Sequence, residues 1–155
     1  PSTGPRCWRF STNRIVIHAD RSDRPLFAYG SLRRGGGADQ RLLREARWLG
    51  TATVVGRLYH DGHYPALIPD PAGTPVIGDL WDVPSHCWPA LDAWEGCGAT
   101  DPQPHPYRRA TLHARIDASP VEAQAYVWSG PINDLHLIGC GDWLAWRGVA
   151  APTPS

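Results

Sequence analysis

The chain has 155 residues, with 15 basic and 15 acidic side chains and a formal net charge of zero at pH 7. A chain of this length usually folds as one domain with a sizeable hydrophobic core. Its balanced charge gives no sign of electrostatic binding to nucleic acid or to an anionic membrane. All fifteen basic residues are arginine, which excludes a mechanism based on a Schiff-base lysine.

The four cysteines are far apart in the chain and form no C-x-x-C pair, which argues against a zinc knuckle or a redox motif. They are Cys7, Cys87, Cys97 and Cys140. No signal-peptide h-region opens the chain, and no apolar run approaches 18 residues. We therefore expect a cytoplasmic protein with reduced thiols, made of a flexible leader (1–24), one domain (25–148) and a disordered tail (149–155).

A short buried strand is predicted at 26–30, where apolar and aromatic residues run together. It ends at Gly30-Ser31, and Gly35-Gly36-Gly37 follow closely. A strand that ends in this way leaves backbone N–H groups without ladder partners, and glycine lets a ligand approach the backbone. Such groups bind carboxylates, phosphates or a developing oxyanion, although an ordinary glycine-rich turn explains the same pattern.

The rest of the chain alternates short strands with two helices. A helix is expected at 38–46 with Asp39 as its N-cap, and a second at 85–95 with Ser85 as its N-cap and Gly96 as its end. Strands are expected at 48–59 (one or two), 64–68 (an edge strand), 75–83 (a central strand), and 107–117 and 121–128 as a hairpin. A proline-rich loop covers 97–106, and 134–144 predicts a helical turn and a tail. This order favours an α+β fold.

The chain has three glutamates, Glu45, Glu95 and Glu122. Glu45 is flanked by arginines on a predicted helix and Glu122 begins a strand after a turn, so both are expected at the surface. Glu95 lies beside Trp94 in the last turn of a predicted helix. An apolar neighbour and the negative end of the helix dipole both raise the pKa of a carboxyl group toward the range of a general acid–base. A capped surface glutamate remains the alternative.

Other chemical signals are weaker. His60-Asp61-Gly62-His63 offers at most three metal ligands in one turn, and a solvated turn is the better interpretation. The three glycines are followed by neither a G-K-S/T sequence nor a G-x-G-x-x-G spacing. No G-x-S-x-G surrounds Ser31, so a hydrogen-bonding role suits it better than that of a nucleophile. We expect no metal and no cofactor.

Four motifs in this order resemble the gamma-glutamylcyclotransferase-like family. They are Tyr29-Gly30-Ser31-Leu32, Gly62-His63-Tyr64-Pro65-Ala66-Leu67, Leu91-Asp92-Ala93-Trp94-Glu95-Gly96 and Tyr107-Arg108-Arg109. The ending Gly139-Cys140-Gly141-Asp142-Trp143-Leu144 is similar to the small bacterial branch of that family. Each motif is short, but their joint presence over residues 26–147 is specific.

The resemblance implies an α+β fold, a small mixed and partly closed β-barrel with two helices. It also implies that a γ-glutamyl amide is cyclised to 5-oxoproline, with release of an amine or amino acid. Glu95 would be the catalytic acid–base, and the loop Tyr29, Gly30, Ser31 and Leu32 would bind the substrate through backbone N–H groups. Tyr64, Tyr107 and Tyr126 would line the pocket. Arg109 is either a pocket cation or a structural residue.

The expected partner is a small γ-glutamyl substrate, with no nucleic acid or membrane, and the protein is expected to be a monomer or homodimer. Asp142 and Trp143 are implied to close the pocket. The leader and the loop 97–106 depart from the family pattern, and the loop is expected to shape the acceptor side of the site. Two alternatives remain open: a non-catalytic small-molecule binding module, and a metal-dependent hydrolase using His60, Asp61 and His63.

Overall fold

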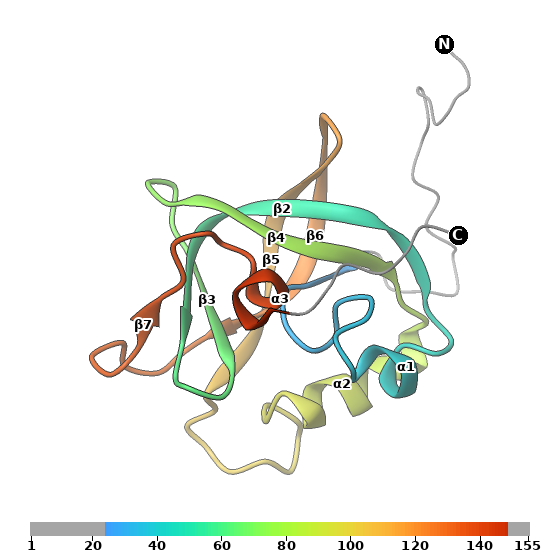
Figure 1. Cartoon of the computed structure of the whole chain (residues 1–155). Helices are drawn as coiled ribbons and strands as arrows, with labels where there is room; N and C mark the ends of the chain where they lie inside the picture. The colour runs from blue at the N-terminus through green and yellow to red at the C-terminus, as the bar shows by residue number, and fades with distance from the viewer. Residues whose placement is uncertain (1–23, 149–155) are drawn as a thin grey trace.

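Five strands form a ring in the computed structural model, which describes residues 24–148 (Figure 1). Their order around the ring is β2 (Arg47–His60), β4 (Thr74–Asp82), β1 (Leu26–Ala28), β6 (Ser119–Trp128) and β5 (Tyr107–Ile116), with β5 pairing back onto β2. The β1–β6 pair is parallel and the others are antiparallel. This mixed, partly closed α+β barrel confirms the predicted fold class.

The long strand β2 connects most of the sheet. It pairs with β3 (Pro65–Pro69), β4, β5 and β7 (His136–Leu137), and it carries an irregularity between Trp48 and Gly50. The sequence left one or two strands open here, and the structure has one. The edge position of β3 and the central position of β4 agree with the predictions.

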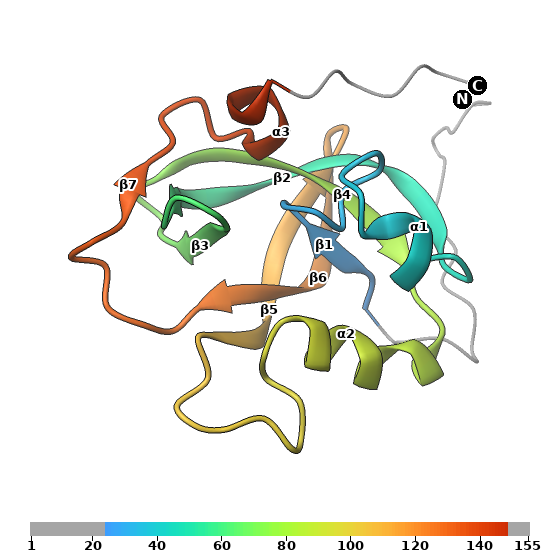
Figure 2. The same ribbon diagram turned by 60° about the horizontal axis from the view of Figure 1, so that its bottom comes forward.

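The short strand β1 is buried on both faces, and its side chains alternate between two apolar clusters. Phe27 packs with the interior of the barrel, together with Val54, Leu58 and Leu80. Leu26 and Ala28 pack instead with the cluster that includes Trp88 and Leu91 of α2 (Trp88–Trp94). Both clusters therefore meet at β1, and the chain leaves this strand at the centre of the molecule (Figure 2).

Three short α-helices and one 3-10 helix are found in residues 24–148. The first, α1 (Asp39–Leu42), is shorter than the predicted helix 38–46, and Asp39 is not its N-cap. The Asp39 carboxylate instead accepts hydrogen bonds from the N–H groups of Gly35 and Gly37. Because these glycines offer free donors just before the helix, the aspartate stabilises the preceding turn rather than a longer helix.

The second predicted helix begins with a 3-10 turn, η1 (Ser85–Cys87), before α2 starts at Trp88. Ser85 is not an N-cap: Pro84 occupies the cap position and makes no side-chain hydrogen bond. Pro89 lies in the first turn of α2, where its missing N–H group costs nothing. The predicted end of the helix is confirmed, since Gly96 has a φ of 77°.

The C-terminal part of the described chain returns to the barrel. The helix α3 (Trp143–Arg147) is capped by Asp142, which accepts a hydrogen bond from the N–H group of Ala145. Trp143 and Leu144 are buried among the barrel side chains. The hairpin β5–β6 is also confirmed, with its turn at residues 117–118 rather than 118–120. No helix in the described residues is long and apolar enough to cross a membrane. The predicted leader lies almost wholly outside the described residues, as does the tail.

Candidate active site

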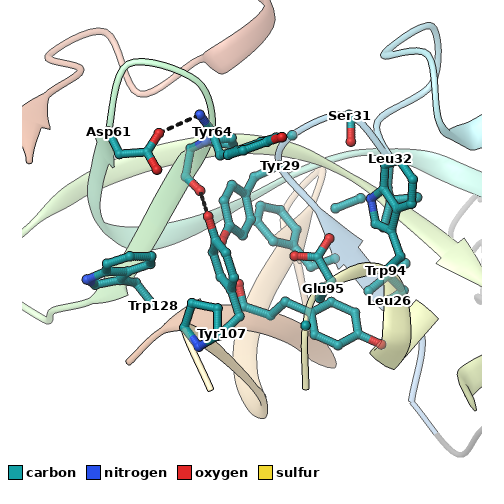
Figure 3. Close-up of a pocket in the computed structure, with 17 residues that line it drawn as sticks. Leu26, Tyr29, Ser31, Leu32, Asp61, Tyr64, Trp94, Glu95, Tyr107 and Trp128 are labelled. Atoms are coloured by element: carbon teal, nitrogen blue, oxygen red, sulfur yellow. Dashed lines mark hydrogen bonds between the residues drawn. The ribbon is translucent and has the colours of Figure 1, made fainter. Parts of the chain in front are cut away.

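A cavity of about 530 Å³ lies between the end of β1, the β2–β3 turn and the end of α2 (Figure 3). Eight of the nine residues predicted for the site line it: Tyr29, Gly30, Ser31, Leu32, Tyr64, Glu95, Tyr107 and Tyr126. They come from β1 and its loop, the start of β3, the end of α2, β5 and β6. The barrel thus brings together segments that are up to about a hundred residues apart in the chain.

The loop after β1 contains backbone N–H groups without a partner in its part that lines the cavity. The N–H groups of residues 33–38 all donate within the protein, to Gly30, Ser31, Arg33, Asp39 and Asp79. Among residues 24–148, no hydrogen bond uses the N–H groups of Gly30, Ser31 or Leu32 as donors. These three groups lie in the part of the loop that lines the cavity, so they are available to an anionic ligand or a carbonyl oxygen.

Close packing explains two of the glycines. A Cβ atom on Gly30 would lie 2.9 Å from the Cγ atom of Pro65 across the cavity wall. A Cβ atom on Gly36 would lie 2.7 Å from the carbonyl oxygen of Ser31. Larger residues at either position would displace the loop and with it the three free donors.

A partly buried ion-pair network holds the loop from outside the cavity. The Arg33 guanidinium contacts the Asp79 carboxylate of β4 at 3.3 Å and the Asp142 carboxylate at 2.9 Å. Asp79 also accepts a hydrogen bond from the N–H group of Arg34. Asp142 therefore joins α3 to the loop, and neither Asp142 nor Trp143 lines the cavity that the resemblance implied they would close.

Glu95 follows the last residue of α2, and its carboxyl group points into the cavity (Figure 3). Its backbone N–H donates to the carbonyl of Leu91 in the last i→i−4 hydrogen bond of the helix. No hydrogen bond to its carboxyl group is found among the described residues. The cavity leaves the side chain partly exposed, but protein atoms surround most of it, and this burial raises the pKa of Glu95 to about 7.

Four tyrosines line the cavity. The hydroxyl groups of Tyr29, Tyr107 and Tyr126 donate hydrogen bonds within the protein. The Tyr29 hydroxyl donates to the carbonyl of Tyr126 at 2.5 Å and accepts from the N–H group of Leu67. The Tyr107 hydroxyl donates to the carbonyl of Pro65. Burial raises the pKa of Tyr29 and Tyr107, so both stay neutral. Tyr64, by contrast, is 65% exposed at the rim.

Arg109 does not line the cavity. Its guanidinium pairs with the Asp92 carboxylate at 3.2 Å and lies over the ring of Trp88 at 4.6 Å from the centroid. Asp92 also accepts a hydrogen bond from the Tyr126 hydroxyl at 2.6 Å. Of the two interpretations of Arg109 that the sequence left open, the structural one agrees with this position. We call Asp92, Arg109 and Tyr126 the Asp92 cluster.

The substrate site predicted from the sequence did not include several residues that line the cavity, among them Asp61, Trp94 and Trp128. Asp61 belongs to the turn between β2 and β3, and the sequence pattern assigned that turn to solvent. From the proline-rich loop 97–106, Pro106 lines the cavity. The single available signal was the position of Asp61 directly before the motif that begins at Gly62.

The metal alternative finds no geometric support in the predicted turn. The Asp61 carboxylate accepts backbone hydrogen bonds, and the His60 ring accepts one from Gly62 and lies against Trp146. Among the described residues, the ligand atoms that gather within 4.8 Å of one another belong to Glu45, His86 and Cys87 at the surface. His60, Asp61 and His63 form no such group.

Comparison with known proteins agrees with this fold. The family model described as "Gamma-glutamyl cyclotransferase, AIG2-like" matches residues 26–145. The gamma-glutamylcyclotransferase family protein YtfP of Escherichia coli K12 is 32% identical over 126 residues, which are 77% of this chain and 95% of that protein.

Two solved structures have the same fold. The solution structure of ytfP from Escherichia coli is 28% identical with a TM-score of 0.58, and the match covers 79% of this chain and 98% of that chain. An AIG2-like protein from Mus musculus, at 19% identity, gives a TM-score of 0.64 over 85% of this chain and 97% of that chain. The fold and the family match together show that the chain belongs to the gamma-glutamyl cyclotransferase, AIG2-like family.

Proposed function

We propose that this protein is a gamma-glutamylcyclotransferase, which cyclises a γ-glutamyl amide to 5-oxoproline and releases an amine or amino acid. One observation carries the proposal: the Glu95 carboxyl group has no hydrogen-bond partner among the described residues, and burial in the cavity raises its pKa to about 7. A carboxyl group with this pKa accepts and returns a proton at neutral pH with little cost in either direction.

The reaction needs no nucleophile from the protein, because the substrate carries its own. In its carboxylate form, Glu95 takes one proton from the substrate's α-ammonium group. The freed amine forms a bond to the γ-carbonyl carbon, which closes the five-membered ring. Glu95 then returns the proton to the amide nitrogen as its bond to the γ-carbon breaks. The attacking nitrogen's remaining extra proton passes to the released amine, which leaves as an ammonium ion.

The free donors of the β1 loop complete the proposed site. The N–H groups of Gly30, Ser31 and Leu32 would bind the α-carboxylate or stabilise the oxygen of the γ-carbonyl group as negative charge develops on it. The rings of Tyr29, Tyr107 and Tyr126 would hold the apolar part of the glutamyl chain. The ion pairs of Arg33 keep this loop in place from outside the cavity.

The test is an assay for 5-oxoproline with a panel of γ-glutamyl amides and γ-glutamyl amino acids. We expect turnover by the wild-type protein, and a loss of about 10²-fold or more in kcat for Glu95→Gln, which keeps the shape of the side chain but cannot exchange the proton. Glu122→Gln is the matched control, because Glu122 pairs with Arg24 at the surface, outside the cavity.

Two results would count against the proposal. If Glu95→Gln keeps wild-type kcat, another group moves the proton. If the wild-type protein releases no 5-oxoproline from any compound of the panel but binds one of them, and Glu95→Gln binds it equally well, the alternative of a non-catalytic binding module replaces the enzyme.

A further inference from the structure

Three side chains with different metal-binding atoms meet at the surface beside the start of α2. Glu45, His86 and Cys87 offer a carboxylate oxygen, an imidazole nitrogen and a thiol sulfur, and these atoms all lie within 4.8 Å of one another. We call these residues the Cys87 cluster. None of the three lines the cavity, so the cluster is separate from the proposed active site.

The backbone around Glu45 is anchored in the apolar core. Glu45 lies in the link between α1 and β2, which turns through a hydrogen bond from the N–H group of Ala46 to the carbonyl of Leu43 at 3.1 Å. Leu43 is 2% exposed and packs in the apolar cluster that includes residues of α2, and Ala46 packs against the same cluster. The fold therefore sets the position from which the Glu45 side chain extends.

The backbone of the other two residues is held in the same way. His86 and Cys87 belong to η1, where the N–H group of Cys87 donates to the carbonyl of Pro84 at 2.9 Å. Cys87 packs against the apolar cluster that anchors the Glu45 link, and the buried Trp88 follows it as the first residue of α2. The spacing of the Cys87 cluster is thus a product of core packing between two segments.

The donor atoms are close to the spacing of a tetrahedral zinc site. The Nε2 atom of His86 lies 2.9 Å from the Oε1 atom of Glu45. Metal–ligand distances of about 2.0–2.3 Å place the donor atoms of a tetrahedral site about 3–4 Å from one another. The side chains of Glu45 and His86 are 65% and 66% exposed, so small rotations bring all three atoms to this spacing.

The chemistry of the donor set selects the kind of ion. A thiolate and a carboxylate carry two negative charges between them, which match the charge of a divalent cation, and the imidazole binds in its neutral form. Sulfur and nitrogen ligands suit Zn²⁺, whereas Mg²⁺ and Ca²⁺ prefer oxygen ligands throughout. Because two of the three side chains are largely exposed, solvent can reach the fourth position of a tetrahedral site.

We propose that Glu45, His86 and Cys87 bind one Zn²⁺ ion, with water as the fourth ligand, and that the ion fastens the link between α1 and β2 to the start of α2. On binding, the Cys87 thiol releases its proton to solvent. The proposal departs from the expectation of no metal, because Glu45 and His86 are 41 positions apart and no local motif joins them. It does not depend on the proposed function.

Titration of the full chain with Co²⁺, a spectroscopic substitute for Zn²⁺, tests the ligand set. We expect a near-ultraviolet charge-transfer band from the Cys87 thiolate and visible bands of a four-coordinate ion. Cys87→Ser should lose the charge-transfer band. Cys140→Ser is the matched control, because Cys140 is also an accessible cysteine but lies outside the cluster, with its Sγ atom near the carbonyl of Asp142. This control should keep the whole spectrum.

Calorimetry with Zn²⁺ measures the affinity. One ion should bind per chain, and Cys87→Ser should weaken the binding by about 100-fold or more, since loss of a residue that only supports a metal ligand costs about 10–100-fold. Glu45→Gln should weaken it at least about tenfold. Glu122→Gln, which changes another exposed glutamate, should leave the affinity unaltered. A large excess of Mg²⁺ should not displace the ion.

Two further measurements need no substitution at the site. Zn²⁺ should slow alkylation of Cys87 in the wild-type protein, followed by mass spectrometry, and leave the alkylation of Cys140 unchanged. One equivalent of Zn²⁺ should also raise the midpoint of thermal unfolding, because the ion binds the folded arrangement. The rise should persist in Cys140→Ser and disappear in Cys87→Ser.

The results that would overturn the proposal are equally distinct. A Co²⁺ spectrum without a thiolate band, a Zn²⁺ affinity that is the same in Cys87→Ser and Cys140→Ser, or alkylation of Cys87 at an unchanged rate would show that the cluster is not a metal site. Tight binding at Cys87 with no change in the unfolding midpoint would overturn the fastening role.

Discussion

Asp92 and Glu95 are acidic side chains one helical turn apart at the end of α2, and they have opposite surroundings. Asp92 accepts a hydrogen bond from the Tyr126 hydroxyl at 2.6 Å and pairs with Arg109 at 3.2 Å. Glu95 faces the cavity without a hydrogen-bond partner for its carboxyl group among the described residues, and burial raises its pKa to about 7. Two carboxyl groups on one short helix therefore have different roles because their surroundings differ.

The difference between Asp92 and Glu95 predicts that substitutions at the two positions affect different properties. The Asp92 cluster joins α2 to β5 and β6, since Arg109 and Tyr126 come from those strands. Placing an unpaired carboxyl group in a partly buried site costs free energy, and the packing and ion pairs around it offset that cost. We therefore expect changes in the Asp92 cluster to act mainly on the free energy of unfolding, and changes at Glu95 mainly on turnover.

The largest expected effect on stability comes from the pKa of Glu95 itself. Its pKa is about 7 in the folded protein against 4.5 for an unperturbed glutamate, so the folded state holds a proton that the unfolded state releases between pH 4.5 and 7. The free energy of unfolding therefore falls as the pH rises through this range, by up to about 3 kcal/mol for a shift of this size.

Urea denaturation of the wild-type protein and Glu95→Gln at pH 5 and pH 8 checks this sign. Because glutamine does not titrate, the variant should gain stability relative to the wild type between the two pH values, by about 1–3 kcal/mol. Glu122→Gln should show no such change. An equal difference between wild type and Glu95→Gln at both pH values would mean that Glu95 is not desolvated, and the comparison with Asp92 would lose its basis.

A smaller effect is expected for Asp92→Asn, which removes the charge that faces Arg109 and weakens the bond from Tyr126. The free energy of unfolding should fall by about 2 kcal/mol, while kcat should fall less than tenfold, far less than for Glu95→Gln. Urea denaturation and the 5-oxoproline assay measure the two effects on the same samples. Asp70→Asn, which breaks an exposed ion pair, should cost less than about 1 kcal/mol. Loss of turnover at full stability would place Asp92 in the catalytic machinery.

The smallest effect is expected for Tyr126→Phe. The ring still lines the cavity, but the hydroxyl bond to Asp92 is lost, at a cost of about 1 kcal/mol in the free energy of unfolding. The carbonyl of Tyr126 still accepts from Tyr29. KM should rise no more than about threefold. A rise of tenfold or more, with no loss of stability, would show that the hydroxyl group binds substrate rather than Asp92.

Where the sequence predictions held, the signal was local or came from several motifs in order. The end of the helix at Gly96 follows from the backbone requirement of a single residue, since Gly96 has a positive φ, whereas β1 ends at Ala28, two residues before the predicted end at 30. The resemblance selected Glu95 and the loop from Tyr29 to Leu32, and the structure places all five in one cavity. Their roles in binding and catalysis stay predictions until the assays are done.

The wrong predictions concern side chains that have more than one possible hydrogen-bond partner. Asp39 and Ser85 have side chains typical of N-caps, but neither caps a helix. Asp39 binds the N–H groups of Gly35 and Gly37 instead, because the loop that they belong to folds back against it. A pattern of residue types shows which donors and acceptors exist but not which pair forms. Asp61 is exposed, as the sequence predicted for its turn, and it also lines the cavity.

By itself, the sequence determined the positions of most strands, the end of α2 and the family, because each depends on neighbouring residues or on a short ordered set of motifs. The tertiary structure alone decided that β2 closes onto β5, that Asp61 and Glu95 share one cavity, and that Arg109 points away from it. Burial and ion pairing depend on residues far apart in the chain, so the environment of a charged group is known only when the whole barrel has formed.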